Sequence, residues 1–149
     1  RVDVHAMLHA LADDARALSA GQHTINVTVG EDAAISGSAD ELRSAFGNLA
    51  SNAVRYTPDG GTIRLDWGVK DGHAVYSVTD TGIGIAHEHI PRLTERFYRV
   101  DPSRKRASEE GTGLGLSIVD AVMRAHGGHV SVDSKLGEGA TFTLHFPLN

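Results

Sequence analysis

The apolar residues of this chain switch repeatedly between the spacing of a helix and the alternation of a strand. From Val4 to Leu18 they recur at helical intervals, whereas His23 to Gly30 alternates apolar and polar side chains, as a half-buried strand does. A second helical stripe over residues 39–56 follows Ser38, which forms a capping box with a glutamate three residues later, and should end before Pro58. Because strands follow each helix, both are expected to share one hydrophobic core.

The remaining patterns complete the fold class. We expect a short strand near 34–36 and further strands at 62–69, 73–79, 129–134 and 140–146. A short helix is expected over 87–96 and a polar loop over 101–110. A last helix should begin in the glycine-rich segment 111–116, carry Ile118 on its apolar side and end at Gly127-Gly128. This order predicts an α+β fold. It should be a two-layer sandwich with a mixed, mostly antiparallel sheet and its helices packed on one face.

Bulk composition excludes several classes of function. The chain has 149 residues, which fits a single domain, and its net charge of -5 argues against a nucleic-acid-binding surface. No segment has the length of apolar sequence that crosses a bilayer. The absence of cysteine excludes disulfides, thiolate catalysis and cysteine-based zinc sites.

Four polar residues share one face of the helix expected at 39–56. Asn48, Asn52, Arg55 and Tyr56 are spaced i, i+4, i+7 and i+8, and the two asparagines flank apolar positions. A half-buried carboxamide needs a partner, and a hydrated Mg²⁺, which takes oxygen ligands, is one candidate. Arg55 could then pair with a phosphate and Tyr56 could lie beside a base. Hydrogen bonds from both amides to neighbouring backbone explain this helix equally well.

Two glycine-rich segments have features of ligand-binding loops. Asp80 stands at an expected strand end and is followed by Gly82 and Gly84. A carboxylate can accept from an exocyclic amine such as that of adenine, and glycines allow a ligand to approach the backbone closely. The Gly-x-Gly-x-Gly run at 111–115 leads into a helix, whose N-terminus favours anions, although its spacing is not that of a dinucleotide-binding loop or a P-loop. Each segment alone also fits an ordinary turn or helix entry.

In combination and in this order, the motifs resemble the N, G1, F and G2 boxes of the histidine-kinase catalytic domain. Phe97-Tyr98-Arg99 is similar to the F box, and residues 48–58, 113–119 and 137–142 are similar to the family consensus. That domain belongs to a wider superfamily with gyrase, the Hsp90 chaperones and MutL, and the resemblance covers nearly the whole chain. It implies a Bergerat-type fold that binds ATP with Mg²⁺.

The resemblance also implies a role for each matching residue. Asn48 and Asn52 would bind Mg²⁺, and Asn48 and Arg99 would serve catalysis, with Arg99 orienting the γ-phosphate. Asp80 would accept from the adenine amine, and Phe97 would anchor a lid. The residues expected to contact the nucleotide are Asn52, Arg55, Tyr56, Asp80, Gly82, Gly84, Ile85, Phe97, Gly111, Thr112, Gly113, Leu114, Gly115, Leu116 and Thr141.

The implied reaction is transfer of the γ-phosphoryl group of ATP to a histidine rather than hydrolysis. Superfamily members that hydrolyse ATP have a glutamate where Asn48 stands, and an amide cannot activate water as a base. A neutral imidazole already carries a lone pair, so a histidine acceptor needs little activation.

The acceptor histidine is expected on a separate dimerisation domain, because the family's His-Glu-x-x-Thr-Pro-like box does not occur in this sequence. Residues 1–20 are expected to form a linker helix from that domain, and 21–149 the ATP-binding domain. The start at Arg1 rather than Met suggests a piece of a larger protein. The resemblance implies a membrane-anchored homodimeric parent, with this domain at the cytoplasmic face and a response regulator as partner in a two-component phosphorelay.

Three alternatives remain open from the sequence. A serine kinase of the anti-sigma-factor type would have the same fold, although the F-box wording and the first helix argue against it. A pseudokinase would bind nucleotide without transfer, and Glu110, beside the last glycine run, keeps that reading open. A structural protein with accidental glycine loops is the weakest of the three.

Overall fold

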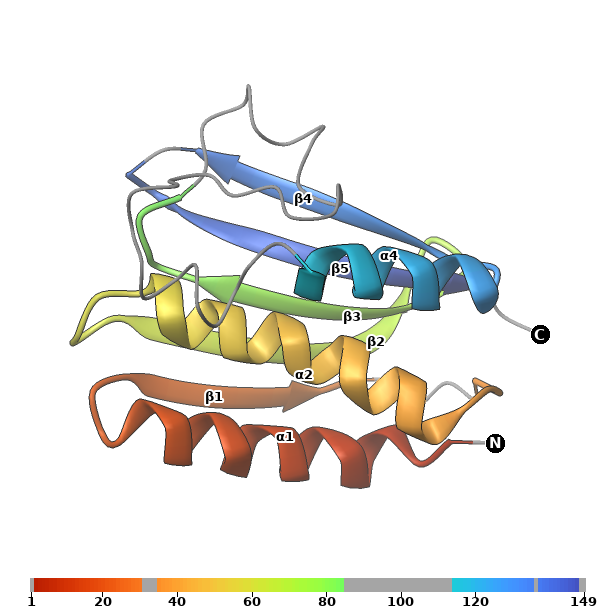
Figure 1. Ribbon diagram of the computed structural model, residues 1–149, viewed down its shortest axis with the longest axis horizontal. Helices are drawn as coiled ribbons and strands as arrows, with labels where there is room; N and C mark the ends of the chain where they lie inside the picture. The colour runs from red at the N-terminus through yellow and green to blue at the C-terminus, as the bar shows by residue number, and fades with distance from the viewer. Residues whose placement is uncertain (1, 31–34, 85–113, 136, 148–149) are drawn as a thin grey trace.

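The computed structural model describes residues 2–30, 35–84, 114–135 and 137–147. Within them the chain forms three helices and five strands (Figure 1). In chain order they are α1 (Val4–Ser19), β1 (Thr24–Val29), α2 (Ala39–Tyr56), β2 (Thr62–Lys70), β3 (His73–Asp80), α4 (Leu114–Ala125), β4 (His129–Lys135) and β5 (Gly139–Pro147). The element order predicted from apolar spacing is confirmed for these ranges.

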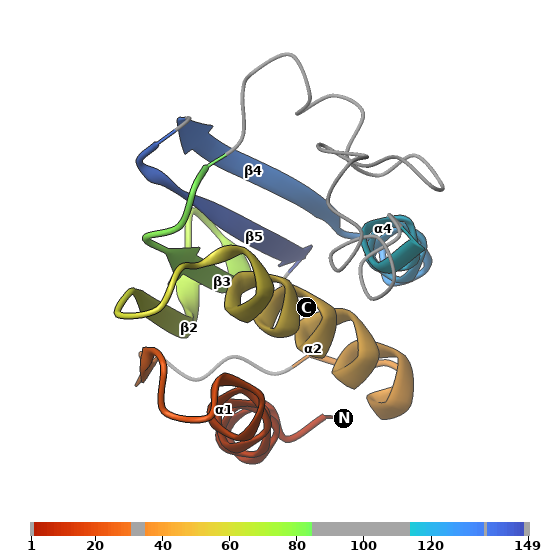
Figure 2. The same ribbon diagram turned by 60° about the vertical axis from the view of Figure 1, so that its left-hand side comes forward.

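The strands form one mixed sheet in the order β1-β2-β3-β5-β4. Strand β1 runs parallel to β2, and every other neighbouring pair is antiparallel. The three helices lie together against one face of this sheet, as Figure 2 shows. The two-layer sandwich with a mostly antiparallel sheet is therefore confirmed.

Local sequence accounts for the ends of several elements. Ser38 caps the N-terminus of α2, and its side chain accepts a hydrogen bond from the backbone N–H of Glu41 at 3.3 Å. The tight turn between β2 and β3 places Asp71 at φ 52° and Gly72 at φ 77°. Two consecutive residues in the left-handed region match the twist of the flanking strands, so this turn fixes the hairpin register.

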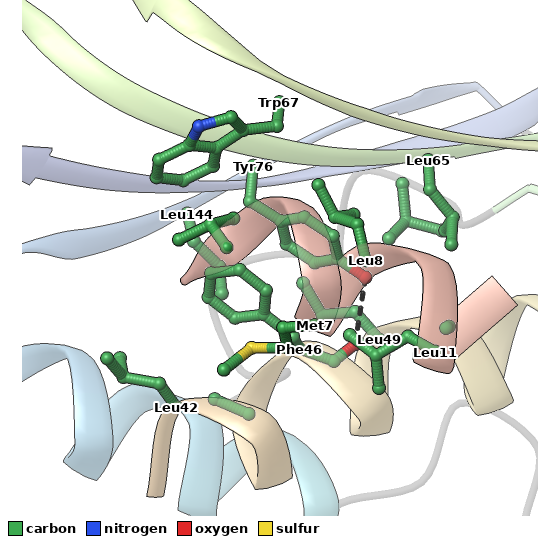
Figure 3. Packing of buried hydrophobic residues seen from close by; sticks show 14 of the residues in the cluster. Met7, Leu8, Leu11, Leu42, Phe46, Leu49, Leu65, Trp67, Tyr76 and Leu144 are labelled. Carbon is green, nitrogen blue, oxygen red and sulfur yellow. Dashed lines mark hydrogen bonds between the residues drawn. The ribbon is translucent and has the colours of Figure 1, made fainter. Parts of the chain in front are cut away.

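Aromatic residues hold α2 against the sheet at the centre of the core. The ring of Phe46 stacks on that of Tyr76 at 4.1 Å between centroids, and the Tyr76 hydroxyl donates to the Phe46 carbonyl at 2.9 Å (Figure 3). Burial raises the pKa of Tyr76 far above its ordinary value, so the hydroxyl stays protonated and donates. Trp67 from β2 and Leu144 from β5 pack beside this pair in the same cluster.

Two expectations of the sequence analysis are wrong, and two lie outside the described residues. Ile35 and Ser36 are not in a strand; the Ile35 side chain is buried, and its carbonyl accepts from the N–H of Val2 at 3.1 Å. Ile118 is 45% exposed, because the buried stripe of α4 is centred on Val119 and Met123. The helix expected at 87–96 and the loop at 101–110 are not among the described residues.

Candidate nucleotide site

The C-terminal half of α2 carries four of the predicted site residues, all of them half-buried. The Asn48 side-chain nitrogen donates to the Ser44 carbonyl at 2.9 Å, and Arg55 Nη1 donates to Asn52 Oδ1 at 3.4 Å. The sequence analysis offered hydrogen bonds to neighbouring backbone as the alternative to a metal site, and such a bond exists for Asn48. It uses only the donor side of that amide, whereas a metal ion would bind the oxygen.

Asp80 ends β3 with its side chain buried beside the start of β5. The same oxygen, Oδ1, accepts from the N–H of Gly82 at 2.9 Å and from the N–H of Ala140 at 3.2 Å. Burial raises the pKa of Asp80 above its ordinary value, and these two N–H donors partly offset that rise. Both of these bonds end on Oδ1, so within the described part of the chain Oδ2 is the oxygen that remains to accept from a ligand amine.

Glycines let three segments converge on Asp80. A Cβ at Gly82 would lie 2.5 Å from the Tyr56 carbonyl oxygen, which ends α2. A Cβ at Gly139 would collide with the Asp80 carbonyl, and Gly139 also has a φ of +90°. Larger residues at either place would push the end of β3 away from α2 or β5, so the close approach depends on glycine.

Sequence reasoning missed two residues at this meeting point. Thr57 directly follows α2 and is 4% exposed, and its Oγ1 has no hydrogen-bond partner among the described residues. That oxygen would lie 3.1 Å from a Cβ at Gly82. The N–H of Ala140 is the other missed contact. Both residues lie in stretches that resemble the family consensus, but no local pattern predicts these contacts, because they arise through the pairing of distant segments.

The structure does not bring Thr141 together with Asp80. Asp80 pairs with Ala140 across β3 and β5, whereas Thr141 pairs with Thr79. Successive side chains of a strand point to opposite faces, so Thr141 lies on the sheet face away from the helices. There its hydroxyl donates to the Thr79 hydroxyl at 3.3 Å.

The remaining predicted contacts are placed only in part. Gly84 is buried and adopts a φ of 73°, and Leu116 in the first turns of α4 is half-buried against the core. Leu114 and Gly115 begin α4. The others lie outside the described residues: Ile85, Phe97, Arg99, Gly111, Thr112 and Gly113.

A family model described as histidine kinase-, DNA gyrase B-, and HSP90-like ATPase matches residues 37–149, which is more than half of the chain. The chain belongs to this family. The matched residues include α2, β3 and β5, whose ends meet around Asp80. The sequence-based prediction of the family is therefore confirmed.

Curated relatives are sensor proteins. The chain is 51% identical over 146 residues to the phosphate regulon sensor protein PhoR of Pseudomonas aeruginosa, covering 97% of this chain and 33% of that protein. It is 45% identical over 119 residues to the sensor histidine kinase CusS of Escherichia coli K12, covering 80% of this chain and 24% of that protein. The chain thus spans about a third or less of the curated relatives it matches.

Solved histidine kinases share the fold. A mycobacterial sensor histidine kinase, MprB, superposes with a TM-score of 0.84 at 28% identity, covering 99% of this chain and 96% of that one. Full-length ShkA in complex with AMPPNP superposes with a TM-score of 0.83 at 32% identity, covering 99% of this chain and 30% of that one. In the part of the chain that the structure describes, no helix is long and apolar enough to cross a membrane.

Proposed function

We propose that this chain binds Mg²⁺-ATP and transfers the γ-phosphoryl group to a histidine on the dimerisation domain of a parent sensor kinase. The observation that carries the proposal is the buried carboxylate of Asp80, held by two backbone N–H groups on one oxygen. The second oxygen can accept from the adenine amine. The family, the sensor relatives and a structural neighbour solved with AMPPNP, an ATP analogue, support this reading.

The length of α2 fits a nucleotide laid along it. Tyr56 adjoins Gly82 at the Asp80 end, and Asn48 lies two turns earlier on the same helix. A rise of about 1.5 Å per residue separates these two residues by roughly 12 Å. That separation is comparable to an extended nucleoside triphosphate, with its base at Asp80, Asn52 and Arg55 along its phosphates and the γ-phosphate near Asn48.

The side-chain oxygens along α2 are suitable ligands for Mg²⁺. Among the described residues, no group of three His, Cys, Asp or Glu side chains could hold a metal ion. Mg²⁺ needs no such cluster, because it commonly takes one or two protein oxygens together with phosphate oxygens and waters. The amide oxygens of Asn48 and Asn52 would supply the protein ligands, and the bound ion would neutralise phosphate charge.

The chemistry required of the chain is positioning and charge stabilisation. Phosphoryl transfer depends on aligned attacking and leaving oxygens or nitrogens more than on covalent catalysis. Asn48 carries an amide rather than a carboxylate, so it cannot deprotonate water and should not promote hydrolysis. Arg55 and Arg99 would balance charge on the phosphates. The attacking imidazole would come from the dimerisation domain.

The wider setting is part of the same proposal. The parent would be a membrane-anchored homodimer, with this domain at the cytoplasmic face, residues 1–20 as the linker helix and residues 21–149 as the ATP-binding domain. A response regulator would take the phosphoryl group from the histidine in a two-component phosphorelay. The sensor relatives support this setting, and the net charge of -5 gives no support to nucleic acid as a partner.

Calorimetric titration with ATP, with and without Mg²⁺, tests the proposal, followed by an assay for released phosphate and for label on an added dimerisation domain. Binding that strengthens with Mg²⁺, negligible hydrolysis and label on histidine are expected. Label on serine would instead favour the anti-sigma type of kinase. Binding without transfer would favour a pseudokinase, and rapid hydrolysis would contradict the role given to Asn48.

A further inference from the structure

The turn that follows α1 contacts the turn that follows α2, and a histidine joins them. His23 Nε2 lies 2.6 Å from the carbonyl oxygen of Thr57, and His23 Nδ1 lies 2.8 Å from Ser19 Oγ. The backbone N–H of His23 also donates to Ser19 Oγ at 2.9 Å. Ser19 is the last residue of α1 and is 4% exposed, so the histidine connects the end of one helix to the end of another.

Hydrogen-bond chemistry fixes the roles of the two ring nitrogens. A carbonyl oxygen can only accept, so Nε2 carries the proton and donates to Thr57. In the neutral ring Nδ1 is then an acceptor, and the Ser19 hydroxyl donates to it while accepting from the His23 backbone. Each polar atom of this pair therefore has a defined partner and direction.

Two backbone bonds reinforce the contact. Gly60 N–H donates to the Gln22 carbonyl at 2.6 Å, and Thr24 N–H donates to the Gly61 carbonyl at 3.0 Å. Residues 22–24 thus hold residues 57–61 through one side-chain and two backbone hydrogen bonds. The side-chain bond is the one that ends on Thr57, directly after α2.

Thr57 links the His23 contact to the candidate nucleotide site, because its side chain lies beside Gly82 and Gly61. Its Oγ1 would lie 3.1 Å from a Cβ at Gly82, and its Cγ2 crowds the space beside Gly61. Gly82 in turn donates to Asp80 Oδ1. Because the space between Thr57 and Gly82 would be tight even for one added carbon, we expect a shift of Thr57 toward Gly82 to displace Gly82 and change the environment of the carboxylate.

We propose that His23 is a positioning residue for the nucleotide site, acting through Thr57 and Gly82 on Asp80. The proposal rests on the proposed function, because it takes Asp80 to be the adenine contact. It makes ATP affinity depend on how the C-terminal end of α1 is placed. By reciprocity, bound nucleotide should stabilise the α1–β1 turn.

Two conservative variants separate the Thr57 contact from the Ser19 contact. In His23→Gln the side-chain amide nitrogen reaches about as far as Nε2, whereas in His23→Asn it reaches only about as far as Nδ1. We expect His23→Asn to weaken Mg²⁺-ATP binding about fivefold, the value of one ordinary hydrogen bond, and His23→Gln to stay within about twofold of the wild type. His129→Asn, an exposed change in β4 on the sheet face away from the helices, is the matched control and should leave affinity unchanged.

The measurements are ATP titration by calorimetry, the free energy of unfolding in urea, and the amide chemical shift of Gly82 without nucleotide. The Gly82 amide should shift in His23→Asn and return to its wild-type position in His23→Gln. Wild-type ATP affinity in folded His23→Asn, or equal weakening in both variants in proportion to lost stability, would overturn the inference. If the wild type itself bound no ATP, the proposed function would fail, while an unmoved Gly82 amide in His23→Asn would separately refute the positioning contact.

Discussion

Among the single residues, Asp80 stands out because its buried charge lowers the stability of the fold, while the same carboxylate is the proposed contact for adenine. The residue is 8% exposed, and burial raises the pKa of its carboxylate, which means that the ionised form is less favourable in the folded chain than in water. Two backbone N–H groups recover part of that cost. A buried carboxylate whose charge costs stability is a good candidate for a functional group, because a neutral side chain that accepts the same two hydrogen bonds would serve the fold at least as well.

Asp80→Asn should separate these two contributions. The Asn oxygen can still accept from Gly82 and Ala140, and removal of the buried charge should leave the free energy of unfolding unchanged or raise it. The side-chain nitrogen replaces Oδ2 and cannot accept from adenine, so ATP affinity should fall roughly ten- to a hundredfold. Urea unfolding and calorimetric titration measure the two effects. Unchanged affinity in a folded variant would refute the assignment of the adenine contact.

Among the secondary-structure elements, α2 and α4 are joined by a histidine: His126, directly after α4, accepts a hydrogen bond from the N-cap residue of α2. His126 Nδ1 donates to the Val122 carbonyl at 2.8 Å, and Nε2 accepts from the N–H of Ser38, the N-cap of α2, at 3.2 Å. The ring occupies the space that a side chain at Gly37 would need. The two helices that bear the N-box residues and the end of the glycine-rich run are thus fixed to each other at this point.

Gly37→Ala should break that contact. The added methyl group would collide with the His126 ring, and we expect the free energy of unfolding to fall by about 1–3 kcal/mol. In a His126→Ala background the obstacle is gone, so the same change should cost far less. A double-mutant cycle in urea measures this difference. Equal costs in both backgrounds would show that the ring is not what excludes a side chain at residue 37.

The sheet face away from the helices carries a cluster of His73, His129 and His145, and this cluster should make stability depend on pH. His145 stacks on His129 at 4.3 Å between centroids, and its Nε2 lies 2.7 Å from Ser131 Oγ. Burial, and then electrostatic repulsion by the neighbouring His129, His73 and Lys70, lowers the pKa of His145 below its ordinary value of 6.5. The unfolded chain therefore binds this proton more readily than the folded chain does.

Stability should accordingly fall as the pH falls below 6.5, the ordinary value for histidine. His145→Gln removes the titrating group and should flatten that decline. The check is the free energy of unfolding in urea across this pH range for both proteins, with His9→Gln, an exposed change on α1, as the control. A decline of the same steepness in His145→Gln and the wild type would contradict the role assigned to this cluster.

Over the molecule as a whole, the features that could be predicted from the sequence are those whose interacting residues lie close together in the chain. Helix α2 was predictable from its cap at Ser38 and its apolar stripe, and the β2–β3 hairpin from alternation and a short turn, since these signals are local. The sequence named Thr141 as a nucleotide contact but could not show which face of the sheet it lies on, because that depends on the register of β5 against β3. The bond from His23 to Thr57 and the narrow space between Thr57 and Gly82 could not be predicted, because they arise where three turns meet in space.

Helix α1 shows how far the molecule behaves as one cooperative unit. Its buried residues Met7, Leu8 and Leu11 belong to the same apolar cluster as Leu49 of α2 and Tyr76 of β3, as Figure 3 illustrates. The proposed division assigns residues 1–20 to a linker helix. The cluster indicates that this helix also closes the core beside β1, which would tie any motion of the linker to the stability of the whole domain.

Leu8→Ala tests that connection. Leu8 is 0% exposed, so truncation leaves a cavity and should lower the free energy of unfolding by about 2–5 kcal/mol. Trp67, the one tryptophan of the chain, lies in β2 and reports on the sheet by fluorescence, while circular dichroism reports mainly on the helices. If α1 and the sheet unfold together, both signals should move to lower urea by the same amount. A shift in circular dichroism alone, with the Trp67 transition unchanged, would instead mean that α1 unfolds independently and that residues 1–20 act only as a linker.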